Sequence, residues 1–286
     1  MKSKSIVYYS LILLGIVHPF LWGISITNHS PEKNDRFGGG GENFIGYRYD
    51  FSGVGISSNG RWATMISNNV FITSSHYYPS TNSNITFWET NDKDGNSVEI
   101  GVSDKYYKIG STDIYLGVLD KALPDNYSIY SITEGFKSQF GQNNQVFLLG
   151  SSSSFSVGEA RINLDSSGYQ KTGSNKGQAF YTAENTSDSL ADTLLRIGDS
   201  GAPVFLFDGR GSMTLLGNNW FIGSTTQNGQ NYYVNVLTDL SPYSDQINNF
   251  VVRNAVAIPE PTTILGVLPI VALGFFRFWR NRSQKG

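Results

Sequence analysis

The fold of this chain is decided around Gly198-Asp199-Ser200-Gly201-Ala202-Pro203, which is followed directly by the apolar run Val204-Phe205-Leu206-Phe207. A serine between glycines can occupy a sharp turn, with its hydroxyl exposed and neighbouring backbone N–H groups pointing outward. That geometry suits a nucleophile beside a site for a developing negative charge. The same residues also suit a plain loop between two strands, because the chain contains 31 glycines. The motif alone leaves the two interpretations level, and the surrounding sequence has to separate them.

Short apolar or aromatic runs, separated by spacers rich in glycine, asparagine, serine and aspartate, fill the chain from Phe44 onward. Examples lie at 45–49, 70–73, 85–88, 114–119, 146–149, 180–181, 204–207, 214–216, 220–222 and 232–236. Such runs with turn residues at short intervals predict an all-β barrel or sandwich. Helical periodicity appears only near the end, where Tyr243, Ile247, Phe250 and Val251 share one face behind Ser241-Pro242. That spacing predicts one short C-terminal helix.

The first residues have the pattern of an export signal. Lys2 and Lys4 precede an apolar run at 6–17, and small residues follow at positions 23 and 25. A basic start, an apolar stretch and small residues predict a secretory signal peptide over residues 1–25. A retained N-terminal anchor is the alternative, which a His-Pro pair interrupting the apolar stretch disfavours. We therefore expect export across the inner membrane.

The C-terminal end carries several features in a fixed order. Pro259-Glu260-Pro261 is followed by an apolar run at 262–276 and by basic residues at 277, 280, 282 and 285. The apolar run is short for a transmembrane helix, which needs about 20 residues. The order resembles a PEP-CTERM sorting signal over residues 257–286. In bacteria that carry it, this signal implies transient membrane anchoring, processing by an exosortase-type enzyme and delivery to the cell surface or extracellular matrix. A plain tail anchor is the alternative.

Composition removes several classes of function. A net charge of −2 gives no electrostatic reason to expect nucleic acid as a partner. The chain has no cysteine, so disulfides, thiolate metal sites and a cysteine nucleophile are excluded. One of its three histidines, His18, lies in the predicted signal peptide, which leaves His29 and His76. We expect no metal and no cofactor, and the sequence leaves the oligomeric state open.

A nucleophilic serine needs a base within hydrogen-bond reach and a carboxylate behind that base. His76 follows the apolar strand predicted at 69–75, and a strand end exposes it. Asp113 opens the apolar run at 113–119, where a carboxylate has to be paired or hydrogen-bonded. A satisfied loop histidine and a strand-capping aspartate are the alternatives for these two residues. The competing groups lie in polar surroundings: His29 in the glycine-rich segment at 26–43, which we expect to be a flexible arm, and Asp104, Asp120 and Asp125.

Taken in chain order, these residues resemble the motifs of trypsin-like serine proteases. Phe71-Ile72-Thr73-Ser74-Ser75-His76 resembles the family's LTAAH, Asp113-Ile114-Tyr115-Leu116 its DIAL, and Gly198-Asp199-Ser200-Gly201 its GDSGGP. Asn231-Tyr232-Tyr233-Val234-Asn235-Val236 resembles the late YTNV strand, and the predicted helix resembles the family's C-terminal helix. The resemblance covers residues 44–252, and the ordered conjunction of motifs makes it specific.

The resemblance implies a serine protease domain over residues 44–256. Its fold would be two six-stranded antiparallel β-barrels of the chymotrypsin type, formed by residues from about 44 to 125 and from about 140 to 236, with a short C-terminal helix. Ser200 would attack a peptide carbonyl, His76 would accept its proton and pass it to the leaving amine, and Asp113 would orient the ring. The backbone N–H groups of Gly198 and Ser200 would form the oxyanion hole.

The sequence departs from the family pattern around the substrate pocket. Ala202 replaces the third glycine of GDSGGP, a change that leaves both oxyanion amides in place, and the pocket cysteines are missing. By position, Leu194 would lie at the pocket floor, with Trp220, Phe221 and Ile222 along a wall. No acidic residue occurs there, except Asp192 after a shift of register. We therefore expect an apolar or small side chain before the scissile bond.

Activation is a further expectation that the resemblance raises. Arg36-Phe37-Gly38-Gly39 resembles a zymogen cleavage site, whose new N-terminus would pair with Asp199. A flexible glycine linker is the alternative interpretation.

The sequence as a whole predicts an exported serine endopeptidase that cleaves a protein or peptide substrate through an acyl-enzyme intermediate. Two alternatives stay open, because a fold hosts more than one function. One is a catalytically silent, protease-like surface or matrix module, and the other is an esterase that uses the same three residues.

Overall fold

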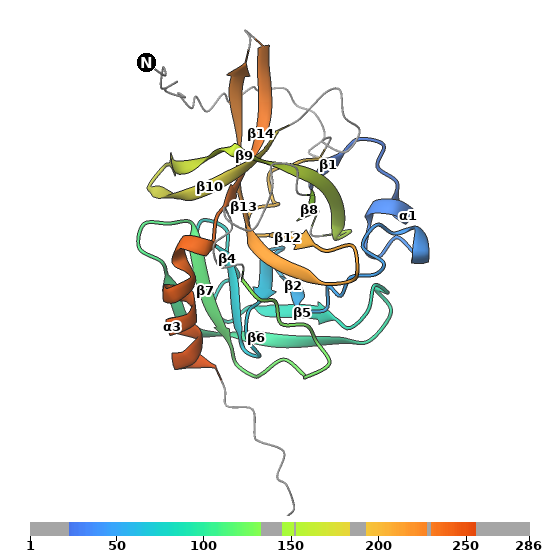
Figure 1. Ribbon diagram of the computed structural model, residues 1–286. Coiled ribbons are helices and arrows are strands. Elements are labelled where there is room, and N and C mark those ends of the chain that lie inside the picture. Colours follow the sequence, from blue (N-terminus) through green and yellow to red (C-terminus); the bar gives the residue numbers. More distant parts are fainter. Residues whose placement is uncertain (1–22, 133–144, 152, 184–192, 228–229, 256–286) are drawn as a thin grey trace, which may run out of the picture. The chain divides into compact units, whose positions relative to one another are not determined.

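Two closed six-stranded antiparallel barrels and a C-terminal helix make up the protein, so the predicted fold is confirmed (Figure 1). The computed structural model describes residues 23–132, 145–151, 153–183, 193–227 and 230–255. The sorting tail and all but the last residues of the predicted signal peptide lie outside these ranges. Within them, no helix combines the length and the apolar character needed to cross a membrane.

Each barrel is formed by strands that are neighbours in one half of the chain. The first has the order β2-β3-β4-β7-β6-β5 and closes between β5 and β2. Its strands are β2 (Val54–Ser57), β3 (Trp62–Met65), β4 (Val70–Ser74), β5 (Asn84–Trp88), β6 (Ser97–Lys108) and β7 (Ile114–Leu119). The second has the order β10-β14-β13-β12-β8-β9 and closes between β9 and β10. Its strands are β8 (Gln145–Gly150), β9 (Ser156–Thr172), β10 (Asn175–Ala183), β12 (Pro203–Phe207), β13 (Met213–Gln227) and β14 (Gln230–Thr238).

The remaining elements lie outside the barrels in the topology. Strands β1 (Ser25–Ile26) and β11 (Thr193–Leu194) form a separate two-stranded sheet. The helical elements are α1 (Pro31–Asn34), the 3₁₀ turns η1 (Gly41–Asn43) and η2 (Ser241–Tyr243), and α3 (Ser244–Asn254).

Alternate side chains of a central strand face two different cores. In β8, Val146 and Leu148 belong to the core of the second barrel, while Phe147 and Leu149 belong to a cluster that both barrels share. Successive side chains of a strand point to opposite faces, so a strand buried on both faces is a continuous apolar run. In the shared cluster, Phe51 from just before β2 packs its ring against Phe147. This cluster fixes the barrels relative to each other.

The register between β4 and β7 brings two distant segments together at one end of the first barrel. Ser74, the last residue of β4, pairs with Ile114, the first of β7. Because the strands are antiparallel, the residues that follow β4 lie beside those that precede β7. The Ser75 N–H accordingly donates to the carbonyl of Asp113 at 3.0 Å. Strand pairing therefore makes His76 and Asp113 neighbours.

Residues 26–43 do not form the expected flexible arm. They include α1 and η1, and Arg36 is among the largest fully buried side chains of the described residues. The Arg36 guanidinium donates to the carbonyls of Trp88 at 2.8 Å and Thr90 at 2.9 Å, and lies over the ring of Phe155. Burial lowers the pKa of Arg36 to about 10. The polar composition of the segment predicted a flexible arm. In the structure, carbonyl oxygens and the ring of Phe155 bind the Arg36 guanidinium and hold the segment in place.

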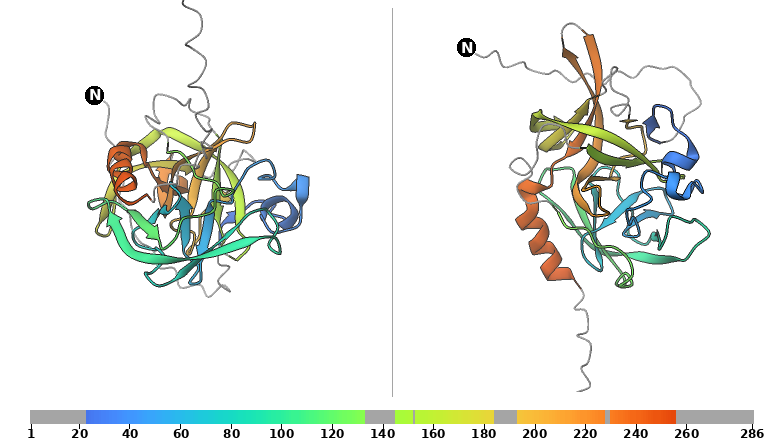
Figure 2. Two further views of the ribbon diagram at one scale, coloured as in Figure 1. Left: turned by 90° about the horizontal axis from the view of Figure 1, so that it is seen from below. Right: turned by 45° about the vertical axis from the view of Figure 1, so that its right-hand side comes forward.

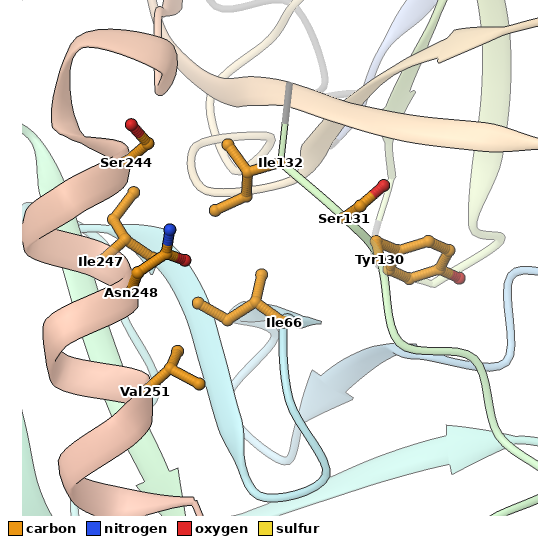
Figure 3. A pocket seen from close by; sticks show the side chains of 8 residues that line it. All are labelled: Ile66, Tyr130, Ser131, Ile132, Ser244, Ile247, Asn248 and Val251. Atoms are coloured by element: carbon orange, nitrogen blue, oxygen red, sulfur yellow. The ribbon is translucent and has the colours of Figure 1, made fainter. Parts of the chain in front are cut away.

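Helix α3 starts behind Pro242 and buries Ile247, as its periodicity predicts. It lies on the outside of the barrels (Figure 2). A pocket of about 210 Å³ lies between one side of the helix and the residues around Ile66 and Tyr130 (Figure 3). The pocket is lined by Ile66, Tyr130, Ser131, Ile132, Ser244, Ile247, Asn248 and Val251. None of the three candidate catalytic residues lines this pocket, which leaves it as a feature of helix packing.

Candidate active site

The structure brings the three predicted catalytic residues together. The Nε2 atom of His76 lies 3.0 Å from the Oγ atom of Ser200, and its Nδ1 atom lies 2.9 Å from both carboxylate oxygens of Asp113. His76 and Asp113 come from the end of β4 and the start of β7 in the first barrel, whereas Ser200 precedes β12 in the second. The competing His29 is bound to Asp35, away from this group. The competing aspartates at 104, 120 and 125 are exposed.

Asp113 is buried and accepts several hydrogen bonds. The residue as a whole is 1% exposed. The Oδ1 atom accepts from the His76 backbone N–H at 3.2 Å, from the Ser75 hydroxyl at 3.0 Å and from the Asn175 amide at 2.7 Å. A buried carboxylate retains its charge only with such partners. Because a carboxylate is only an acceptor, the ring must carry its proton on Nδ1, and Nε2 is left to accept the Ser200 hydroxyl proton.

The turn around Ser200 requires its glycines. Gly198 has a φ of +101° and Gly201 a φ of +85°, values that L side chains rarely adopt. A Cβ atom on Gly201 would also collide with the Thr73 hydroxyl of the first barrel and lie 3.1 Å from the Ser74 N atom. Ala202, by contrast, is fully buried and fits without displacing the turn. Of the two predicted oxyanion donors, neither the Gly198 nor the Ser200 N–H has an acceptor among the described residues.

Asp199, the neighbour of Ser200, is a buried carboxylate held by backbone groups. Its oxygens accept from the N–H groups of Ser151 at 2.8 Å and Arg196 at 2.7 Å, and from that of Ile24. Burial is the largest effect on the group and raises the pKa of Asp199 to about 7, although the three donors act in the opposite direction. The three backbone donors therefore offset only part of the cost of burying this charge.

Phe37, whose amine would pair with Asp199 after a zymogen-type cleavage, packs elsewhere in the described chain. Phe37 packs its ring against Trp88 and Phe155, with centroids 5.1 and 5.8 Å apart. Ile24, well before Phe37, supplies the backbone N–H that binds Asp199. The adjoining Arg36 is buried, so the Arg36–Phe37 bond is not presented for cleavage. The fold therefore gives no support to cleavage at 36–39, and activation by such a cleavage stays a prediction.

The predicted pocket residues differ in how far they reach the surface. Trp220 is 1% exposed and packs with Ala179, Tyr181, Val234 and Val236, so it supports the wall from behind and does not line it. Phe221 is half-buried beside it, and Ile222 is 37% exposed. Leu194 is half-buried in β11, where it pairs with Ser25. Its role as a pocket floor stays a prediction, and Asp192 lies outside the described residues.

Four polar residues of the site, three of them buried and Ser75 partly buried, make contacts that the sequence analysis did not assign. Ser75 and Asn175 donate to Asp113. The Asn219 amide donates to the carbonyls of Leu149 and Asp199 at 2.7 and 3.2 Å. Asn235 accepts from the Leu195 N–H and donates to the Thr193 carbonyl and the Thr182 hydroxyl. The one usable signal is an asparagine inside an apolar strand, as in Val234-Asn235-Val236, because such a group has to find partners.

The comparisons with known proteins add nothing to this geometry. No protein-family model matches the chain, and no curated protein matches it as a relative.

Proposed function

We propose that this chain is an exported serine endopeptidase that hydrolyses peptide bonds through an acyl-enzyme intermediate. One observation carries the proposal: the continuous set of contacts from Asp113 through His76 to the Ser200 hydroxyl, at 2.9 and 3.0 Å. Nucleophile, base and orienting carboxylate within hydrogen-bond distance are the signature of nucleophilic acyl transfer. The free N–H groups of Gly198 and Ser200 support the same reaction, since the intermediate needs donors for its oxyanion.

The chemistry proceeds in two halves. The Ser200 oxygen attacks the substrate carbonyl while His76 Nε2 takes the hydroxyl proton, and the carbonyl oxygen becomes an oxyanion between the two N–H groups. The tetrahedral intermediate then expels the amine, which receives the proton from His76, and an ester to Ser200 remains. Water, deprotonated by His76, attacks this ester, and its breakdown restores the serine hydroxyl and releases the acid. Asp113 keeps its charge and stabilises the imidazolium in both halves.

An edge of β13 gives the proposed substrate a place to bind. β13 pairs with β12 up to Asn218 and with β14 from Asn219 onward. Beyond Asn219, β12 no longer pairs with β13, and no other described strand takes its place on that edge of β13. This unpaired edge begins next to the Ser200 turn, because the Gly201 N–H donates to the Asn219 carbonyl. An extended peptide can add to such an edge through backbone hydrogen bonds. The exposed side chains of Ile222 and Ile197 favour apolar substrate residues.

Covalent labelling tests the proposed reaction. We expect a fluorophosphonate probe to label the full-length chain at one serine, identified by peptide mass spectrometry as Ser200, and the S200A variant not to be labelled. Ser212 is exposed in the loop before β13 and serves as a matched serine, so S212A should label like the natural chain. Absence of labelling in folded protein would remove the proposal and leave the silent module. Turnover of matched peptide and ester substrates separates an endopeptidase from an esterase.

Localisation follows from the two ends of the sequence. We propose that the chain is exported, is anchored transiently by residues 257–286, and is then processed by an exosortase-type enzyme at the membrane. The mass of the protein recovered from the producing cells tests this. A mass lacking both the first residues and the tail is expected, and a mass that includes the tail in the surface fraction would contradict processing.

A further inference from the structure

A buried asparagine of the second barrel contacts the carboxylate of the first. Asn175 is the first residue of β10, and its amide Nδ2 donates to Asp113 Oδ1 at 2.7 Å. This is the shortest of the hydrogen bonds that the Asp113 carboxylate accepts, and Asn175 is only 7% exposed. A hydrogen bond to a charged group in a buried setting is among the stronger ones in proteins. The contact therefore bears directly on the residue proposed to orient His76.

A cation fixes the direction of the Asn175 amide. Lys108, the last residue of β6, donates from Nζ to Asn175 Oδ1 at 2.7 Å. An ammonium group is only a donor, so it must face the amide oxygen, and the amide nitrogen is then the atom turned towards Asp113. The positive charge of Lys108 polarises this amide and strengthens its donation to the carboxylate. Lys108, Asn175 and Asp113 thus form a polarised series that ends at His76.

The position of Asn175 depends on contact between the barrels. It stands at the tip of the β9–β10 hairpin, which turns through Gly173 and Ser174 and ends next to the β6–β7 turn of the first barrel (Figure 1). Backbone docking holds the tip there, because the Lys176 N–H donates to the Ser111 carbonyl at 2.8 Å. Ser111 lies in the segment that leads into Asp113. The second barrel therefore supplies the nucleophile and also a support for the carboxylate of the first barrel.

We infer that Asn175 is a positioning residue which, backed by Lys108, holds the Asp113 carboxylate in the orientation that His76 needs. The inference rests on the proposed function, since it concerns the efficiency of the same site. Asn175 touches no reacting atom; it acts through Asp113. Without its amide, the carboxylate keeps only its hydrogen bonds from Ser75 and His76. The carboxylate and the His76 ring are then held less firmly, and the negative charge beside the imidazolium is less compensated.

Kinetics of four variants test this role in the full-length chain. We expect N175A to lower kcat about tenfold with KM nearly unchanged. The acidic limb of its pH–rate profile should move up by about half a pH unit, because a less compensated carboxylate favours the imidazolium. Lys108 is half-buried, so K108M is the safer variant for folding. K108M should move the acidic limb in the same direction by a smaller amount, and K108R, which keeps the positive charge, should leave the limb where the natural chain has it. K171M removes an exposed lysine of the same hairpin and should match the natural chain.

A second readout does not depend on turnover. The full-length chain with the S200A substitution is labelled with nitrogen-15 histidine, and the His76 Nδ1–H signal is assigned by its loss in H76N. We expect this hydrogen-bonded proton to be sharp in S200A and in S200A/K171M, and broadened by exchange in S200A/N175A. If N175A and K108M match K171M in kcat, pH profile and this signal, the positioning role is overturned. If the natural chain does not react with a fluorophosphonate but the signal still responds to N175A, the proposed function fails and the positioning of Asp113 stands.

Discussion

The two barrels hold their parts of the candidate site by different means. In the first, the pairing of β4 with β7 sets His76 beside Asp113. In the second, Ser200 stands on a turn that needs positive φ at Gly198 and Gly201 and that encloses the carboxylate of Asp199. One half follows from sheet register, and the other from a loop conformation kept by buried polar groups. We therefore expect substitutions in the first half to change mainly activity, and those in the second to change activity and stability together.

The largest effect is expected in the first barrel, from D113N. An asparagine fits the same space, but its amide can donate to His76 Nδ1 and so favours the tautomer that cannot accept the Ser200 proton. We expect kcat to fall about 10⁴-fold, with a change in unfolding free energy of about 1 kcal/mol or less. Asp120, exposed at the other end of β7, provides the control D120N. Equal activity of D113N and D120N would contradict the assignment of Asp113.

The next effect is expected in the second barrel, from G201A. Both its positive φ and the collision with Thr73 force the turn to move, which displaces the Ser200 hydroxyl and the oxyanion N–H groups. We expect kcat/KM to fall about 10²–10³-fold and the unfolding free energy to fall as well. The control is G209A, which has a φ of +72° but nothing within 4 Å of the added carbon. G209A should lose about 1 kcal/mol of stability and no activity. A similar loss of activity in G201A and G209A would mean that the loss does not come from displacing the Ser200 turn.

How far each half could be predicted from sequence follows from the same difference. His76 and Asp113 could be predicted from the sequence, because each stands next to an apolar run, one after it and the other before it. Antiparallel pairing of the two strands then brings these two ends together. Ser200 was visible through its glycines. The residues that support the turn could not be assigned from the sequence. Asn219 and Asn235 act through tertiary contacts, and no sequence spacing marks the partners of such contacts. Arg36 misled the interpretation of its segment for the same reason, since its partners lie in the Trp88–Asn91 region of another strand pair.

A pH dependence of stability is expected from Asp199. Burial raises its pKa to about 7 in the folded protein, from 3.8, so between these values the folded state binds more protons than the unfolded state. The contribution of the group is then full below about pH 4 and is lost as the pH rises through 7, with an upper limit of about 4 kcal/mol. We expect D199N, which has no charge to lose, to gain stability relative to the natural chain between pH 5 and pH 8. Denaturant unfolding at both pH values measures this, and parallel curves for the two proteins would show that Asp199 ionises without cost.

The smallest expected effect compares one buried asparagine from each barrel. Asn235 joins the Leu195 N–H, the Thr193 carbonyl and the Thr182 hydroxyl, and so fixes the segment that leads into the Ser200 turn. Asn69, just before β4, donates instead to the Asn254 carbonyl at the end of α3.

N235A leaves a buried N–H and a buried carbonyl without partners, so we expect it to lose about 3 kcal/mol of unfolding free energy and, because the turn loosens, several-fold in kcat/KM. N69A should lose about 1 kcal/mol and retain its activity, since the helix end it holds is remote from the triad. Denaturant unfolding and steady-state kinetics on both variants measure the contrast. A stability loss in N235A without any loss of activity would mean that the Ser200 turn keeps its shape by itself, and the difference between the barrels would then lie in strand register alone.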